Sequence, residues 1–302
     1  MKKFLERIRL VVRASRLLSQ MANLFTLHIP SKTYWTWEVY GLGRSHKNVL
    51  GISQREILRS GSDHGVAFEV DPLEAEEAIP AKLHFTWSIW RTKMRFSDGR
   101  EVVRIEHPWI SFRKKHGFAP SKSVSGTLVF VPHGNPGFES DPFDVVEYAK
   151  YLSLLPKEFH PLVFCLHAHD VNGKYAREIQ SLGFTVVTVG NSLHPRYVHR
   201  FYEILKDFKY ATSTRIGSQL FYCHEFGVKY FLYDQDKKFQ RYFQALVGRQ
   251  FHNDVIRRIE QSFGFENLAD QSFAKDSIVS DALGLDLANK DFRHYPREEV
   301  ID

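Results

Sequence analysis

The sequence predicts an α/β protein whose second half folds around a parallel β-sheet with helices on both faces. Two observations lead to this fold class. From residue 126 onward, continuous apolar runs alternate with amphipathic stretches, which is the pattern of strands buried on both faces and joined by helices. Each apolar run also ends in a loop of glycine, histidine or small polar residues, as expected where a parallel sheet binds its ligand.

Composition limits the class of protein. The 302 residues are enough for two domains. Hydrophobic and charged contents of 43% and 25% are those of a globular chain. The net charge of +6 is a mild excess, which suits an anionic substrate or membrane surface better than nucleic acid. Cys165 and Cys223 lie in apolar runs without a metal-binding spacing, so we expect buried thiols in a reducing cytosol.

The N-terminal segment, residues 1–25, is basic and has a helical pattern. Its apolar run is too short to span a membrane, and arginines interrupt it at positions 7, 9, 13 and 16, which argues against a signal peptide. Two interpretations stay open: a basic amphipathic helix lying on an anionic membrane, or a helix packed on its own domain. We expect a cytoplasmic protein, at the inner face of the membrane in the first case.

Residues 1–118 are predicted to form a mixed N-terminal domain. Its strands are expected over residues 66–70, 81–90 and 101–105. A turn at 97–100 would suit a hairpin. The acidic stretch 71–77 is expected to form a short solvated helix. His107 precedes Pro108, so the chain is expected to follow an extended path there. The polar, basic stretch 114–123 contains glycine and proline and is the best linker. We therefore place the domains at 1–118 and 119–302.

The second domain is predicted to repeat a unit of strand, loop and helix. Its strands are expected over residues 127–131, 161–166, 184–189 and 228–233. Its helices are expected over residues 144–155, 174–182, 196–208 and 219–225, with a long basic helical tail at 237–263. Gly227 is expected to end the fourth helix before the last strand.

Four loops of this domain are expected at one edge of the sheet and carry the candidate donor-binding residues. These residues are Gly134, His167, Asp170, Gly190, Asn191, Ser213, Arg215, Gly217 and Ser218. Glycine lets a ligand approach the backbone, and histidine and arginine neutralise phosphate. Ser218 is expected at a helix N-cap, where N–H groups favour an anion. Glu225, at the other end of that helix, is a further candidate, with a solvated helix end as the alternative.

The candidate catalytic residues are a carboxylate and two histidines that could act as a general base. Asp63 and His64 lie in a polar loop of the first half, and His133 follows the first strand of the second half. A structural role is the alternative for each of them. The sequence contains no nucleophile elbow, dinucleotide fingerprint or P-loop. Neighbouring side chains of the stretch 167–170 would point apart, so we expect no metal.

Residues 124–235 resemble the carboxyl-terminal domain of GT-B glycosyltransferases, in particular bacterial surface-polysaccharide enzymes that are sialyltransferase-like or Kdo-transferase-like. The resemblance rests on residues 126–130 with Pro132-His133, on the strand ending at His167, on the unit 183–190, and on residues 213–227 with the strand that follows. It implies a two-domain, GT-B-like, metal-independent enzyme that uses no cofactor. By position, His167 and Ser213 or Ser218 would hold the donor's nucleotide and phosphate. His167 is followed by Ala168 where such families often have proline, which leaves the donor class open.

The expected function is transfer of a sugar from a nucleotide-sugar donor to a glycan or lipid-linked acceptor, in the biosynthesis of a surface polysaccharide such as capsule or lipopolysaccharide. A CMP-linked acidic sugar is the preferred donor. Two alternatives stay open. A non-catalytic glycan- or nucleotide-binding protein would bind the ligand without turnover, and a GT-B-shaped nucleotide-sugar epimerase would need no acceptor.

Overall fold

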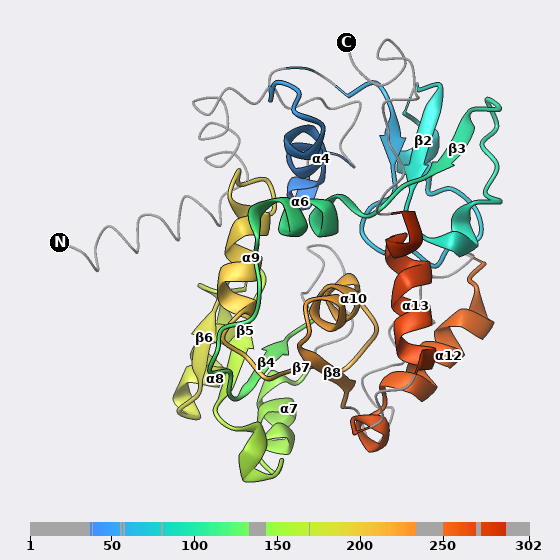
Figure 1. The fold of residues 1–302 in the computed structure, drawn as a ribbon. Coiled ribbons are helices and arrows are strands. Elements are labelled where there is room, and N and C mark those ends of the chain that lie inside the picture. The colour runs from blue at the N-terminus through green and yellow to red at the C-terminus, as the bar shows by residue number, and fades with distance from the viewer. Residues whose placement is uncertain are drawn as a thin grey trace. The chain divides into compact units, whose positions relative to one another are not determined.

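The structure is a computed structural model that describes residues 37–132, 143–233, 250–269 and 273–287, apart from single residues at 38, 55, 57, 80 and 169. These residues divide into two compact units (Figure 1). The five-stranded unit contains residues 119–132, 143–233 and 263–269. The three-stranded unit contains residues 37–118, 250–262 and 273–287. His133, Gly134, the N-terminal segment and residues 237–249 of the predicted tail helix lie outside the described residues.

The five-stranded unit is built on a parallel sheet, as the sequence predicts. Its strands are β4 (Thr127–Phe130), β5 (Leu162–Cys165), β6 (Thr185–Val187), β7 (Tyr210–Ser213) and β8 (Lys229–Leu232). They lie side by side in the order β6-β5-β4-β7-β8, and every neighbouring pair is parallel. Phe130 pairs with Cys165, and Cys165 with Val187. The strands therefore end in one row, which forms the carboxyl edge of the sheet.

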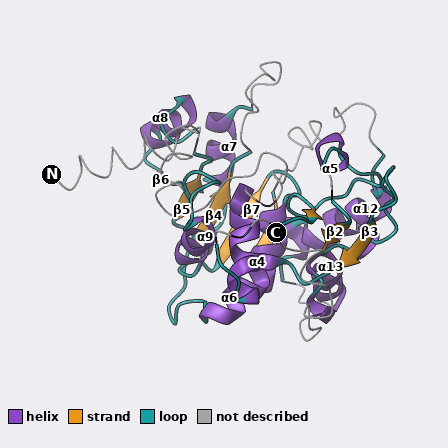
Figure 2. Ribbon diagram, turned by 90° about the horizontal axis from the view of Figure 1, so that it is seen from above, coloured by secondary structure: helices purple, strands orange, loops and turns teal. Residues whose placement is uncertain are grey.

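Helices cover both faces of this sheet. They are α7 (Val145–Leu152), α8 (Lys174–Ser181), α9 (Tyr197–Leu205) and α10 (Ser218–Glu225). The chain moves outward through β4, β5 and β6 and then returns to β7 and β8. Right-handed crossovers therefore place α7 and α8 on one face and α9 and α10 on the other, and Figure 2 shows α7 and α8 across the strands from α9. The order of the strands reverses between β4 and β7.

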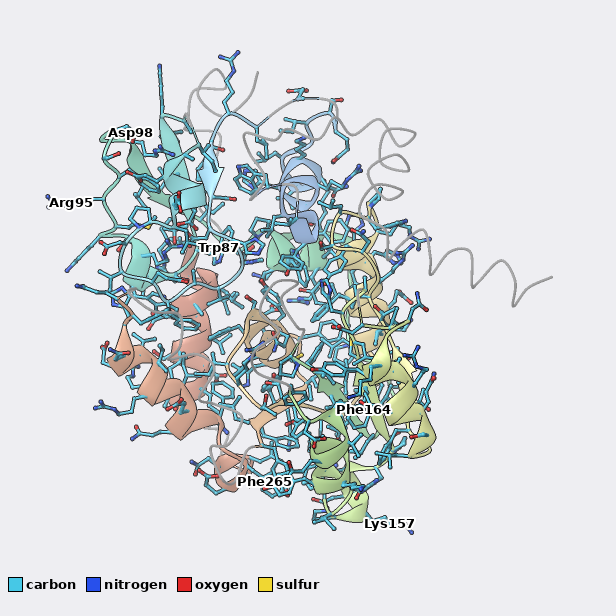
Figure 3. The ribbon with its side chains drawn as sticks, turned by 180° about the vertical axis from the view of Figure 1, so that it is seen from behind. Trp87, Arg95, Asp98, Lys157, Phe164 and Phe265 are labelled. Carbon is cyan, nitrogen blue, oxygen red and sulfur yellow. The ribbon has the colours of Figure 1, made fainter. Side chains whose placement is uncertain are left out.

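Alternate residues of each strand point to opposite faces of the sheet. Val129 and Phe164 are fully buried in the core beneath α7 and α8, and Figure 3 shows Phe164 among the strands of this unit. Phe130 stacks on Phe201 of α9, with ring centroids 6.1 Å apart. Burial on both sides explains why these strands appear in the sequence as continuous apolar runs. Cys165 and Cys223 are buried free thiols, as expected.

The start of one helix, α10, differs from the prediction. Asp144 caps α7, because its Oδ1 accepts the Glu147 N–H at 2.8 Å. The predicted N-cap of the fourth helix, Ser218, is instead its first helical residue, and the N-cap is Gly217. No side chain caps α10. Gly227 follows its end with a φ of 92°, in the left-handed region that favours glycine.

The three-stranded unit also contains a parallel sheet. Its strands β1 (Gly61–Ser62), β2 (Leu83–Thr86) and β3 (Glu101–Arg104) lie in that order. Because β2 and β3 are parallel, the predicted hairpin at 97–100 is wrong. The 3-10 helix η2 (Ile89–Arg91) lies on their connection. The predicted strand at 66–70 is also wrong, since only Glu69 forms an isolated bridge there, with Phe251.

A helix also replaces the extended path expected at His107-Pro108. Helix α6 (Pro108–His116) starts at the proline, whose missing N–H needs no partner there. His107 itself is extended, and its Nδ1 accepts the Trp109 N–H at 3.1 Å. The residue before a proline is extended in both cases, so the preference for β geometry could not separate a helix start from a strand-like path.

The other described elements are short helices that belong to the two units. They are η1 (Val39–Gly41), α4 (Leu42–Leu50), α5 (Glu74–Glu77), η3 (Lys157–Phe159), α12 (Asn253–Phe263), η4 (Phe265–Asn267), α13 (Phe273–Leu283) and η5 (Leu285–Leu287). The chain passes between units at residues 118 and 119. Residues 250–262 and 273–287 belong to the three-stranded unit, whereas the prediction gave all of 119–302 to the second domain. None of the described helices is long and apolar enough to cross a membrane.

Candidate functional site

Three loops of the five-stranded unit meet at the carboxyl edge of its sheet. His167 and Asp170 follow β5, and Gly190 and Asn191 follow β6. Residues 214–218 follow β7. Because the strand order reverses between β4 and β7, the β7–α10 loop borders the point where open α/β sheets bind their ligands. The structure therefore brings candidates from all three loops to one edge.

The β7–α10 turn is shaped by the hydroxyl of Ser213. Its Oγ donates to the Arg215 carbonyl oxygen at 2.5 Å and accepts the Tyr230 hydroxyl at 2.7 Å. Burial raises the pKa of Tyr230, so its phenol keeps the proton that it donates. Ser213 thus holds the turn in place, while its predicted contact with a nucleotide stays a prediction. Arg215 and Ser218 lie in the same turn and are half-buried.

Thr214 is a candidate that the sequence reasoning missed. Its side chain is fully buried, and its Oγ1 has no hydrogen-bond partner among the described residues. A buried hydroxyl without a partner costs about 1–3 kcal/mol, so native proteins keep few of them. A ligand oxygen bound at this turn would satisfy it. A threonine at the end of a strand is common for steric reasons, and for that reason the sequence gave no signal.

The other two loops use their candidates to form turns. The Asn191 Oδ1 accepts the Leu193 N–H at 2.8 Å, and Gly190 has a φ of 95° that few other residues adopt. The His167 carbonyl oxygen accepts the Asp170 N–H at 2.9 Å. The side chains of His167 and Asp170 are half-buried. Contact of these four residues with a ligand remains a prediction.

Glu225 does not join this group. It is the last residue of α10, whose first residue is Ser218. A crossover helix runs back toward the start of the next strand, and eight residues at 1.5 Å each separate its ends by about 10 Å. Glu225 therefore lies toward the opposite edge of the sheet.

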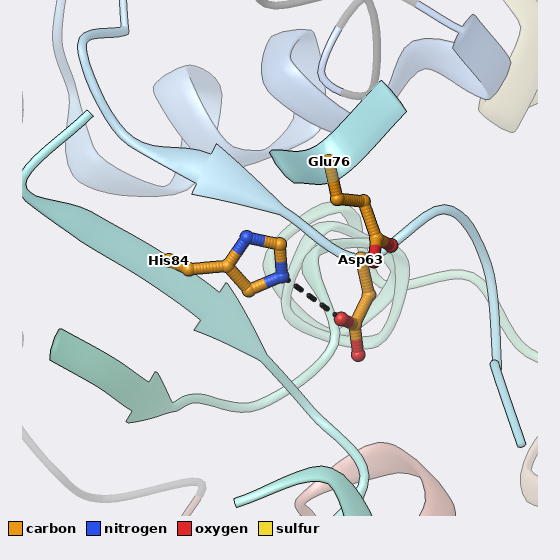
Figure 4. A group of neighbouring side chains, drawn as sticks. All are labelled: Asp63, Glu76 and His84. Atoms are coloured by element: carbon orange, nitrogen blue, oxygen red, sulfur yellow. Dashed lines mark hydrogen bonds and ion pairs between the residues drawn. The ribbon is translucent and has the colours of Figure 1, made fainter. Parts of the chain in front are cut away.

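In the three-stranded unit, Asp63 stands at the centre of a buried polar cluster. It follows β1 directly, and its carboxylate accepts the His84 Nε2–H at 3.0 Å and the Thr86 hydroxyl at 2.6 Å. An Arg91 N–H donates to the same carboxylate at 2.7 Å, and a second donates to Glu76 at 2.8 Å. All five side chains are fully buried. Figure 4 shows one ring nitrogen of His84 directed at Asp63, with Glu76 approaching from α5.

The Arg91 guanidinium lies between the two carboxylates of this cluster. Burial alone would raise the pKa of Asp63, but Arg91 and the hydrogen bonds from His84 and Thr86 outweigh it and hold that pKa below its usual value. Ligand atoms of Asp63, Glu76 and His84 lie within 4.8 Å of one another, a spacing that could hold a metal ion. The Arg91 guanidinium already supplies the positive charge between the two carboxylates, so the geometry fits an ion-pair network better than a metal centre.

This burial bears on the predicted catalytic residues. Asp63 is enclosed by its hydrogen-bond donors, and its assignment as a base stays a prediction. His64 is half-buried, and its ring centroid lies 5.0 Å from that of Tyr40. Glu76 is buried, so the interpretation of residues 71–77 as a solvated helix is wrong at that position. A signal was present in β2, where His84 and Thr86 put two polar groups on one face of a short strand.

No family model, no curated protein and no solved structure matches the chain.

Proposed function

We propose that the chain is a GT-B-like, metal-independent glycosyltransferase whose five-stranded unit binds a nucleotide-sugar donor. The observation that carries this proposal is the β7–α10 turn at the reversal of the strand order. It combines a buried hydroxyl in need of a partner, Thr214, with a helix start at Gly217 that no side chain caps. Its position in the chain is the one at which the resemblance to glycosyltransferases places the donor phosphate.

In this proposal the turn stabilises the leaving group. The N–H groups at the start of α10 and the Thr214 and Ser218 hydroxyls donate to phosphate oxygens, and Arg215 offsets the negative charge that grows as the sugar leaves. His167 adds a contact to the nucleotide. The three-stranded unit takes the acceptor, a glycan or a lipid-linked sugar, and His64 or His133 removes the proton from its hydroxyl.

The proposal is tested first by binding. We expect the purified protein to bind one of CMP, UDP or GDP, seen as a rise in the melting temperature and as heat in calorimetry. Arg215→Ala should weaken that binding about ten- to a hundredfold, which corresponds to the loss of a charge-assisted hydrogen bond of about 1.5–3 kcal/mol. Lys229→Ala is the matched control, because Lys229 is exposed at the opposite edge of the same sheet.

Thr214→Val gives a sharper result, because the two side chains have the same shape. It removes the buried hydroxyl that has no partner among the described residues, so the ligand-free unit should become as stable as the parent or more stable. Nucleotide binding should nevertheless weaken. If the Thr214→Val protein binds every nucleotide as tightly as the parent does, this turn is not part of the binding site.

Turnover then separates the proposed enzyme from its alternatives. A transferase releases nucleotide from its sugar donor faster when the acceptor is present. Binding without release of nucleotide would indicate a non-catalytic binding protein. Interconversion of two sugars on the intact donor would indicate an epimerase.

A further inference from the structure

The buried phenol of Tyr230 connects strand β8 to the turn after β7, and the proposed function gives it no role. Its hydroxyl donates to Ser213 Oγ at 2.7 Å, and Ser213 Oγ donates to the Arg215 carbonyl oxygen at 2.5 Å. Tyr230 is the partner of Ala211 in the two parallel strands, so its side chain points to the same face of the sheet as Ser213, two positions further along β7. The Gln219 side chain of α10 also forms a hydrogen bond with this phenol. The hydroxyl therefore lies where β7, β8 and α10 meet.

The bond from Ser213 fixes the direction of the peptide group between Arg215 and Ile216. In a trans peptide, the carbonyl oxygen of one residue and the N–H of the next point in opposite directions. The Arg215 carbonyl oxygen points at Ser213, so the Ile216 N–H points away from it. That N–H has no hydrogen-bond partner among the described residues. Ile216 is buried, and the N–H groups of buried residues are mostly paired in native proteins.

Thr214 supplies a second group of this kind in the same turn. Its buried hydroxyl also lacks a partner among the described residues. A phosphate offers acceptor oxygens for both groups. If the peptide group were turned over, the Arg215 carbonyl oxygen would replace the Ile216 N–H, and an acceptor would then face the phosphate. The direction of this peptide group therefore decides whether the turn attracts or repels an anion.

We infer that Tyr230 is a positioning residue of the donor site, which through Ser213 keeps the Ile216 N–H, and not the Arg215 carbonyl oxygen, directed at the donor's phosphate. This inference rests on the proposed function for the identity of its ligand. It gives Ser213 an indirect role, because the single proton of that hydroxyl is donated to the Arg215 carbonyl oxygen and not to a nucleotide. The bond from Tyr230 strengthens this donation, since hydrogen bonds in a chain polarise one another.

The test compares each nucleotide with its nucleoside, because the inference concerns the phosphate alone. CMP and cytidine, UMP and uridine, and GMP and guanosine are titrated by NMR, and the pair that the parent binds is then used for the variants. Tyr230→Phe removes the hydroxyl and keeps the ring. We expect it to weaken the nucleotide about three- to tenfold, as for the loss of one neutral hydrogen bond, and to change the nucleoside by less than about twofold. A purely structural role would leave the ratio of the two affinities as it is in the parent.

Ser213→Ala shows whether Tyr230 acts through Ser213. When Ser213→Ala is already present, Tyr230→Phe should change the affinity for the nucleotide by less than about twofold, since the link to Arg215 is absent in both proteins. The double variant should also be more stable than Ser213→Ala alone, because it does not leave the buried phenol hydroxyl without its acceptor.

Thr212→Val is the matched control. It removes a buried hydroxyl of the same strand, which donates to the Phe231 carbonyl oxygen of β8 at 2.8 Å and makes no bond to the turn. We expect it to leave the ratio of the two affinities unchanged.

Three results would overturn the positioning role. Tyr230→Phe could leave both affinities unchanged, or it could weaken nucleotide and nucleoside equally. Its effect could also be the same with and without Ser213→Ala, which would mean that Tyr230 does not act through Ser213. None of these results would contradict nucleotide binding itself.

Failure of the proposed function looks different, because the parent would then bind none of the six compounds. Inorganic phosphate is the probe in that case. It should shift the amide NMR signal of Ile216 in the parent, and Tyr230→Phe should need a higher phosphate concentration for the same shift. No shift in the parent would overturn the positioning role as well.

Discussion

Two buried histidines should make the stability of the three-stranded unit depend on pH. Burial lowers the pKa of His46 to about 4, with a further contribution from Lys47. Burial also lowers the pKa of His107 to about 3, although the Asp63 carboxylate acts in the opposite direction. His46 stacks on Trp37 with ring centroids 5.0 Å apart. Both rings are therefore predominantly neutral in the folded protein from about pH 5 upward.

The sign and size of the effect follow from these values. The unfolded chain takes up a proton on each histidine as the pH falls through 6.5, the ordinary value, whereas the folded unit does not. Stability therefore falls as the pH falls from 6.5 toward 4. Each pH unit in this window costs about 1.4 kcal/mol per histidine, so going from about pH 7.5 to about pH 5 should cost about 2 kcal/mol for His46 and a similar amount for His107.

The assay uses the distribution of tryptophan. All five tryptophans lie between residues 35 and 109, so tryptophan fluorescence during denaturant unfolding reports on the three-stranded unit. We expect His46→Phe to reduce the loss of stability between the two pH values by about 2 kcal/mol, because the aromatic ring is kept and the titrating group is removed. Any fixed cost of the substitution appears at both pH values and cancels.

The control is His116→Gln in α6, since His116 is exposed and should leave the pH dependence as it is in the parent. The reasoning is refuted if His46→Phe loses as much stability as the parent between the two pH values. A loss of pH dependence in His116→Gln equal to that in His46→Phe would refute it too.

Two further predictions concern the same unit and the same fluorescence assay. Arg91→Met should destabilise it by about 3–5 kcal/mol, since it leaves two buried carboxylates without their cation. Asp63→Asn should cost less, about 1–3 kcal/mol, because Arg91 keeps its bond to Glu76 at 2.8 Å. The double variant should cost less than the sum of the two, and strict additivity would contradict the ion pair. Gly99 and Gly284 both have positive φ, but an added Cβ meets nothing at Gly99 and lies 2.5 Å from the Ile105 carbonyl oxygen at Gly284. Gly99→Ala should cost about 1–2 kcal/mol and Gly284→Ala about 1–3 kcal/mol more, whereas equal losses would argue against that close approach.

The five-stranded sheet could be predicted because its strands are buried on both faces. Burial on both faces requires continuous apolar runs such as residues 161–166 and 184–189, and few other structures produce them. Strand β7 was not among the four strands given a range, because its four residues include a threonine and a serine and form no continuous apolar run. Once the strands were predicted, the loops at their carboxyl ends were predicted too, together with the candidate residues in those loops.

The three-stranded unit was predicted less well, for physical reasons. Strand β1 has two residues, Gly61 and Ser62, and no apolar pattern can mark so short a strand. The carboxylate of Glu76 looked solvated because the sequence does not show that Arg91, 15 positions later, meets it in the interior. Local preference could not detect either feature, since tertiary contacts decide both. The burial of the Thr214 hydroxyl could not be predicted for the same reason.

The return of the chain to the three-stranded unit has a consequence for how the protein is made. The Ser88 hydroxyl donates to the Ala282 carbonyl oxygen, 194 positions along the chain, at 3.4 Å, and the His107 N–H donates to Leu283 at 2.8 Å. Closing so long a loop costs about 5 kcal/mol in chain entropy, less once the inserted five-stranded unit has folded. During synthesis, strands β1 to β3 and the tryptophans leave the ribosome well before α12 and α13. The three-stranded unit, which begins first, can therefore finish folding only after the five-stranded unit has been synthesised.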